Sequence, residues 1–128
     1  MEKVTGIGGL FFRSQNPESL ARWYYERLGV TVTPTSYDDL PWQQQGGPTA
    51  FAPFPLQTEY FGDASHAWMV NFRVSNLEAM VAQLRAAGVA VTIDAETYPN
   101  GRFARLCDPE GNPIELWEPS GSREPRAD

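Results

Sequence analysis

Glu115 is the residue of this sequence whose chemistry most needs an explanation, because it interrupts an apolar run that otherwise predicts a buried strand. The run follows a Gly-Asn-Pro turn within the stretch RLCDPEGNPIELWEP, residues 105–119. A carboxylate taken out of water is costly unless it is paired with a cation, protonated or bound to a metal ion. Ion pairing, proton transfer and metal ligation are therefore the three chemistries that this position indicates.

The elements that must position Glu115 occur in two similar copies. Residues 10–32 and 70–91 each contain an apolar strand ending in Phe-Arg, an asparagine, a helix with an acidic first turn, and a Gly-Val sequence. Asparagine is a strong N-cap, so the helices are predicted near 17–28 and 77–87.

Strand-like runs broken by proline and glycine follow each predicted helix. The sequence therefore predicts two strand–helix–strands modules, near 5–62 and 66–118, within a single domain over 1–119. Residues 120–128 are polar and predict a flexible tail.

The repeat and the stretch DPEGNPIELWEP together resemble the vicinal oxygen chelate family, which includes glyoxalases, bleomycin-resistance proteins and extradiol dioxygenases. The resemblance covers nearly the whole chain up to Pro119, and Asp-Pro-x-Gly-Asn-x-Ile-Glu-Leu is its most specific part. It implies an α+β fold in which two βαβββ modules, with eight strands, form a cupped, partly open mixed β-sheet barrel with flanking helices. Chains of this length in the family commonly form homodimers. In metal-using members the glutamate of this motif is a ligand, which implies that Glu115 points into the cup.

Side-chain alternation along the strands predicts which other residues line this cup. One set in each strand is purely apolar and suits packing under a helix, which leaves the mixed aromatic and charged set to face the cup. The loop over 38–55 supplies a further candidate wall, with Trp42 and Phe54 available for stacking. The predicted ligand-contacting residues are Phe11, Arg13, Trp42, Phe54, Met69, Asn71, Arg73, Phe103, Arg105 and Trp117. Alternatively, Arg13 and Arg73 lie at strand ends and reach solvent, since arginine is rarely buried without a partner.

The other metal-ligand positions that the resemblance implies do not carry suitable side chains. They fall at Gly9, Met69 and Ala50. One carboxylate and a thioether are a poor set for a hard divalent ion, and His66 would need a bulge in the strand to reach the same point. The sequence therefore disfavours a divalent metal, and no cofactor is expected.

Two functions of different classes remain open. One is a protein that, in the manner of the bleomycin-resistance proteins, binds a small organic molecule in an aromatic, arginine-containing cup. The other is a lyase, isomerase or dioxygenase-type enzyme that acts on a small oxygenated substrate, with Glu115 as acid, base or metal ligand. Aromatic neighbours would raise the pKa of Glu115 and a nearby arginine would lower it.

Composition excludes several partners. The 128 residues carry sixteen acidic and ten basic side chains, a net charge of −6, which argues against binding a nucleic-acid backbone. The sequence contains no run of 18 apolar residues, so no membrane span is expected. The one cysteine, Cys107, cannot form an internal disulfide, which favours a reducing cytoplasm.

Overall fold

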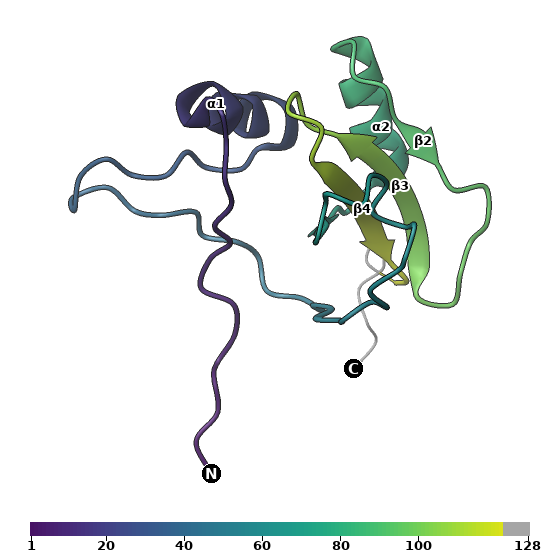
Figure 1. The fold of residues 1–128 in the computed structure, drawn as a ribbon, viewed down its shortest axis with the longest axis horizontal. Helices are drawn as coiled ribbons and strands as arrows, with labels where there is room; N and C mark the ends of the chain where they lie inside the picture. Colours follow the sequence, from purple (N-terminus) through teal and green to yellow (C-terminus); the bar gives the residue numbers. More distant parts are fainter. Residues whose placement is uncertain (122–128) are drawn as a thin grey trace.

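A computed structural model of the chain describes residues 1–121, and most of the predicted tail therefore lies outside the described residues. Figure 1 shows the arrangement of its two helices and four strands. In chain order they are α1 (Pro17–Leu28), β1 (Val70–Arg73), α2 (Leu77–Ala86), β2 (Thr92–Ile93), β3 (Gly101–Cys107) and β4 (Pro113–Pro119).

The strands form one mixed sheet with the order β1-β4-β3-β2. Strand β1 runs parallel to β4, whereas β3 is antiparallel to both β4 and β2. The order β1–α2–β2–β3–β4 is the βαβββ order expected of the second module. The prediction of an α+β fold with a mixed sheet is therefore confirmed, but the sheet is open and is not a barrel.

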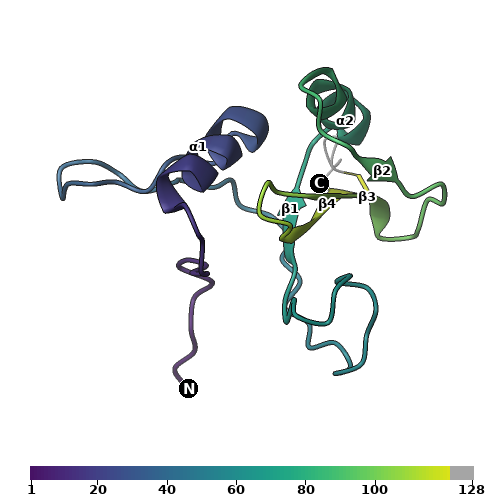
Figure 2. The ribbon, with the colours of Figure 1, turned by 45° about the horizontal axis from the view of Figure 1, so that its top comes forward.

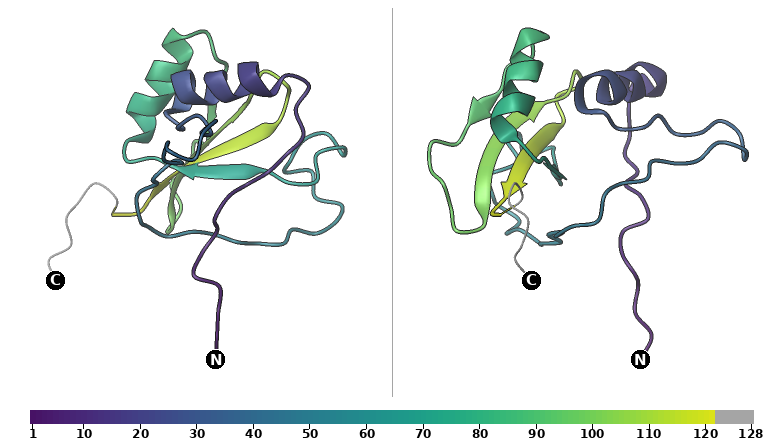
Figure 3. Two further views of the ribbon diagram at one scale, coloured as in Figure 1. Left: turned by 90° about the vertical axis from the view of Figure 1, so that its left-hand side faces the viewer. Right: turned by 180° about the vertical axis from the view of Figure 1, so that it is seen from behind.

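The prediction of two modules with eight strands is wrong, because residues 1–121 contain a single βαβββ module. Within residues 1–121, the segment 1–62 contributes helix α1 and otherwise runs through turns and extended chain without a strand ladder. Its strand-like runs are interrupted by Pro34, Pro48, Pro53 and Pro55. Proline lacks the backbone N–H that a ladder needs, so these runs cannot form an uninterrupted central strand. Figure 3 shows the N-terminal segment extending away from the sheet.

Both predicted helices are present, and their caps explain where they begin. The side chains of Asn16 and Asn76 accept hydrogen bonds from the backbone N–H groups of Ser19 (3.2 Å) and Ala79 (3.1 Å). Helix α1 ends at Leu28 and is capped by Gly29, whose φ of 73° is the left-handed conformation that glycine adopts without strain. Local sequence chemistry is therefore sufficient to set these boundaries.

The core lies between the helices and one face of the sheet. Figure 2 shows α1 and α2 on the same side of the strands. The alternating apolar set of β3 and β4 is buried against them, as the strand pattern predicts. The buried apolar residues are Leu20, Tyr24, Leu77, Val81, Leu84, Val91, Ala104, Leu106, Ile114 and Leu116. Neither helix in the described range has the length and apolar character needed to cross a membrane.

The turn between β3 and β4 holds helix α1 in place through two acidic residues. Asp108, 4% exposed, accepts a hydrogen bond from the hydroxyl of Tyr24 (2.7 Å) and also from the backbone N–H of Asn112 (3.0 Å). Glu110 accepts from the Ser14 hydroxyl at 2.7 Å and the Gln15 N–H at 2.9 Å, just before the helix begins. This turn therefore connects helix α1 of the N-terminal half to the sheet of the C-terminal half.

Replacing Tyr24 by phenylalanine should lower stability and change how it depends on alkaline pH. The change leaves Asp108 without one buried donor, which should cost about 1–2 kcal/mol in the free energy of unfolding. Burial, and then the bond to Asp108, raises the pKa of Tyr24 above its ordinary value of 10.0. The folded chain therefore keeps a proton that the unfolded chain loses, and this contribution is complete below about pH 10 and is lost as the pH rises further.

Urea unfolding midpoints measured at neutral pH and in steps through about pH 9–11 test this prediction. Tyr24→Phe should unfold at lower urea at neutral pH and lose less stability across the alkaline range than the wild type. Tyr25→Phe, which alters the exposed neighbour on the same helix, serves as the matched control. Equal midpoints for the two variants would show that the bond to Asp108 does not stabilise the fold.

Candidate functional site

Glu115 lies in the central strand β4, between Asn71 of β1 and Arg105 of β3. The strand register pairs it with both residues directly. Its neighbours Ile114 and Leu116 point into the helix-covered core, so Glu115 lies on the opposite face of the sheet. Its side chain is nevertheless only 8% exposed. A buried carboxylate on this face must be satisfied by side chains that lie over the strands.

Two neutral donors bind the Glu115 carboxylate. The hydroxyl of Tyr60 donates to Oε2, and the amide Nδ2 of Asn71 donates to Oε1 at 2.7 Å. Among residues 1–121 the ion pair within 4.0 Å is between Arg102 and Glu78, so Glu115 is not part of a direct ion pair. Glu115 is therefore stabilised by hydrogen bonds. Of the three chemistries expected for it, direct ion pairing is absent among the described residues.

Tyr60 contacts Glu115, and the sequence did not indicate this contact. Burial, followed by the hydrogen bond to Glu115, raises the pKa of its hydroxyl, and nearby Arg105 opposes this shift. Tyr60 therefore remains a proton donor at neutral pH. It is 55 positions from Glu115 in a segment of turns, and the aromatic cluster of Phe54, Tyr60 and Phe61 is the only signal that could have indicated it.

Arg105 contacts the same tyrosine through its aromatic face. The guanidinium Cζ lies 4.4 Å from the centre of the Tyr60 ring, a cation–π distance. Its Nε is buried and has no hydrogen-bond partner in the described chain. Arg105 was predicted to contact ligand, and the structure places it beside Glu115 with one donor still unused.

The strand residues next to this polar group are aromatic. Phe103 and Trp117 are cross-strand partners with parallel rings, 6.3 Å between centroids. The indole Nε1 of Trp117 donates to the Asn100 carbonyl at 2.8 Å, which fixes the ring. Gly101 makes this packing possible, because a Cβ there would lie 2.8 Å from the Trp117 Nε1. Both predicted aromatic residues therefore extend the Glu115 face of the sheet.

Arg73 holds a loop against the sheet. Its guanidinium donates to the carbonyls of Gln45 (2.6 Å) and Pro48 (2.6 Å) and to the Thr49 hydroxyl (3.2 Å). A side chain on Gly47 would approach Arg73 Nε to 3.0 Å, so the glycine allows the loop to lie against it. Arg73 thus binds segment 45–49 to the edge of the sheet.

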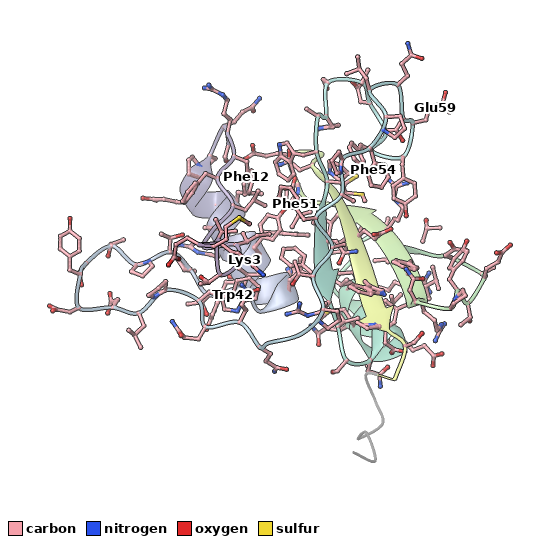
Figure 4. The ribbon with its side chains drawn as sticks, turned by 90° about the horizontal axis from the view of Figure 1, so that it is seen from below. Lys3, Phe12, Trp42, Phe51, Phe54 and Glu59 are labelled. Carbon is pink, nitrogen blue, oxygen red and sulfur yellow. The ribbon has the colours of Figure 1, made fainter. Side chains whose placement is uncertain are left out.

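Several predicted residues lie away from Glu115. Phe11 is 95% exposed, and with Arg13 it lines a separate cavity of about 340 Å³ beside Trp68. Trp42 contacts Phe72, on the helix-covered side of the sheet. Figure 4 shows Trp42 and Phe12 on the α1 side of the molecule and Phe54 beside the strands. Met69 directly precedes β1 and is half-buried.

The side chains around Glu115 do not fit a divalent metal. Its hydrogen-bonding neighbours are a phenol and an amide, which are weaker metal ligands than carboxylate or imidazole groups. Within the described range, no cluster of three or more His, Cys, Asp or Glu side chains could hold a metal ion. His66 lines the cavity beside Phe11 and Arg13.

Comparisons with known proteins agree on the family of this fold. A family model described as a glyoxalase-like domain matches residues 9–117. An antibiotic-binding protein, TnmS3 from Streptomyces sp. CB03234, is similar over 94% of this chain and all of its own, with 22% identity and a TM-score of 0.61. A glyoxylase/bleomycin resistance protein/dioxygenase domain from Frankia sp. EAN1pec covers 91% of this chain and 99% of its own, with 18% identity and a TM-score of 0.56. The search of curated proteins found no significant match to the chain.

Purified protein should contain no stoichiometric transition metal bound at Glu115. One carboxylate with neutral neighbours resembles a weak contact with a hydrated ion rather than a complete site. Elemental analysis of the wild type and of Glu115→Gln should therefore give the same metal content. About one equivalent of Ni, Zn, Fe or Mn per chain that disappears in the variant would contradict this prediction and would mean that other side chains complete a site.

Proposed function

Because the chain belongs to the glyoxalase-like domain family, we propose that it binds a small organic molecule on the Glu115 face of the sheet, without a divalent metal. The observation that carries this proposal is a buried carboxylate, held by neutral donors, on an aromatic sheet face. Small-molecule sites typically combine apolar and aromatic walls with a few polar groups that orient the ligand.

Each part of this face has a distinct contribution to binding. The parallel rings of Phe103 and Trp117 offer flat apolar surface for a planar compound. Glu115 and Asn71 offer an acceptor and a donor, and Arg105 adds a cation. Structural similarity to an antibiotic-binding protein supports a binding role for this fold, since the two chains share it along almost their whole length.

Proton-transfer catalysis is a second candidate, favoured by the bond between Tyr60 and Glu115. A phenol and a carboxylate that share a hydrogen bond in a partly buried site can act as a general acid and base. Such an enzyme would be of the lyase or isomerase type, because these reactions move protons without a redox cofactor. Turnover of a bound compound, as opposed to its unchanged release, distinguishes this candidate from simple binding.

Glu115→Gln should weaken binding of planar oxygenated aromatic compounds. The variant keeps the shape of the side chain but removes its charge, and a hydrogen bond to a charged group contributes about tenfold to hundredfold in affinity. Screening such compounds by thermal shift, followed by titration of tryptophan fluorescence, measures the effect. Glu78→Gln, which alters an exposed ion pair, should leave affinity unchanged. If no compound binds the wild type, or if both variants bind equally, the proposed site is wrong.

We also propose that the chain forms a homodimer. Among the described strands, one edge of β1 has no partner, and unpaired edges readily associate. Large apolar side chains of the N-terminal half are exposed, and exposed apolar surface of this kind favours association with a second chain. They include Val4, Ile7, Leu10, Phe11, Leu40, Phe51, Phe54 and Leu56.

Light scattering across a dilution series should give twice the 14.3 kDa mass of one chain. A mass equal to one chain at every concentration would contradict the dimer. Phe11→Asp places a charge on this exposed apolar surface and should shift the equilibrium toward the monomer.

A further inference from the structure

Tyr60 lies in a segment, residues 55–66, whose own hydrogen bonds are local. The backbone N–H groups of Thr58 and Gly62 donate to the carbonyls of Pro55 and Glu59, each at 3.0 Å. In the described part of the chain, the bond from Tyr60 to Glu115 is the one hydrogen bond between this segment and the sheet. The segment can therefore leave the sheet as a unit, at the cost of the contacts made by Tyr60 and its aromatic neighbours.

The surroundings of the Tyr60 side chain are those of a bound phenol. Its hydroxyl donates to the buried Glu115 carboxylate, and the Arg105 guanidinium lies over its ring at 4.4 Å. The Phe54 ring is 6.0 Å away and within 22° of parallel. Tyr60 itself remains partly exposed, at 37%. A flat ring with a hydroxyl is thus recognised by an acceptor, a cation and an aromatic neighbour.

We propose that Tyr60 is an internal occupant of the ligand subsite at Glu115, and that the ligand is a planar hydroxyaromatic compound that displaces it. This inference rests on the proposed binding function and names the chemical class of the ligand. The hydroxyl of the ligand takes over the bond to Glu115 Oε2, and its ring takes over the contacts with Arg105 and Phe54.

The charges around Tyr60 favour a neutral donor over an ion. An anionic group placed at the Tyr60 hydroxyl would be repelled by the buried carboxylate of Glu115. A cationic group beside the ring would be repelled by Arg105. A phenol avoids both costs, because its donor faces the carboxylate and its ring faces the cation.

Displacement of Tyr60 also gives Arg105 access to a partner. Its Nε is buried and has no acceptor while Tyr60 covers the guanidinium. Leaving such a donor without an acceptor costs free energy. A second oxygen on the ligand, positioned as a carbonyl or hydroxyl acceptor, can satisfy it. The preferred ligand is therefore a hydroxyaromatic ring with an additional oxygen acceptor.

The test uses 4-methylphenol, which is the side chain of tyrosine as a free molecule, and the variant Tyr60→Ala. Removing the internal occupant should increase the affinity for 4-methylphenol by about tenfold or more over the wild type, measured by calorimetry. On the variant, 4-methylanisole should bind about tenfold more weakly, because it has the ring but no donor. The anion 4-methylbenzoate and the cation 4-methylbenzylamine should also bind more weakly than 4-methylphenol.

Tyr98→Ala is the matched control, because Tyr98 also donates to a carboxylate, Asp94, at 2.9 Å and contacts Phe103. It should retain the wild-type affinity for 4-methylphenol. Circular dichroism checks that the variants are folded. If Tyr60→Ala does not fold, Tyr60→Phe decides the question, because it removes the competing hydroxyl and should bind 4-methylphenol several-fold more tightly than the wild type.

Equal affinity of the folded Tyr60 variant and the wild type for 4-methylphenol would overturn the inference, as would equal binding of 4-methylanisole. The compound screen on the wild type separates this failure from failure of the proposed function. Wild-type binding that depends on Glu115, with no gain in the Tyr60 variants, would refute the internal occupant alone. Absence of binding by the wild type and by the Tyr60 variants would refute both.

Discussion

The buried carboxylate of Asp108 is the interaction on which the arrangement of the other elements depends. One side-chain oxygen accepts from the backbone N–H groups of Glu110 (2.8 Å) and Asn112 (3.0 Å), which closes the turn between β3 and β4. The other oxygen accepts from Tyr24 at 2.7 Å and so holds α1 against the sheet. A buried carboxylate without these donors would be unstable, so the turn, the register and the helix position are coupled. That register places Arg105 opposite Glu115.

Strand alternation then gives the two faces of the sheet different roles. Ile114 and Leu116 lie under the helices, and burial of such side chains is the main stabilising contribution of the sheet. Glu115 and Trp117 lie on the other face with Asn71 and Phe103, where polar groups and flat rings remain near the surface. A shift of one residue in β4 would exchange these roles, so the site depends on the same register as the core.

The bonds from Tyr24 to Asp108 and from Tyr60 to Glu115 differ in the segment that carries the tyrosine. Tyr24 is in the middle of helix α1, which is anchored at its beginning by Glu110, so its bond to Asp108 is part of a rigid unit. Tyr60 is in a segment whose backbone bonds are local, so its bond to Glu115 can be exchanged without unfolding the sheet. The same chemistry therefore stabilises the fold at one position, and at the other it covers the surface where we propose that a ligand binds.

The sequence by itself determined the helices, the βαβββ order of residues 70–119 and the separation of core and site residues along β3 and β4. These features depend on contacts between near neighbours, namely the caps at Asn16 and Asn76 and the period-two alternation around Glu115. The resemblance carried by the DPEGN turn identified the family and indicated Glu115 as a candidate site residue. It could not indicate that Asp108 and Glu110 hold α1, because those bonds join residues more than eighty positions apart.

Only the tertiary structure decided what covers Glu115 and what Arg73 binds. Tyr60 and Arg105 meet because a turn segment lies over the sheet, and no local pattern encodes that position. The strand-like runs of the N-terminal half alternate correctly, yet a strand exists only when its N–H and C=O groups find a neighbouring strand. That requirement for a neighbouring strand explains why a single module with an open edge forms. It also explains why Phe11 and Trp42 lie away from Glu115. The alternation of apolar and polar residues specifies the two faces of a strand. Pairing between strands depends on segments that are distant in the sequence, and local patterns do not determine where those segments lie.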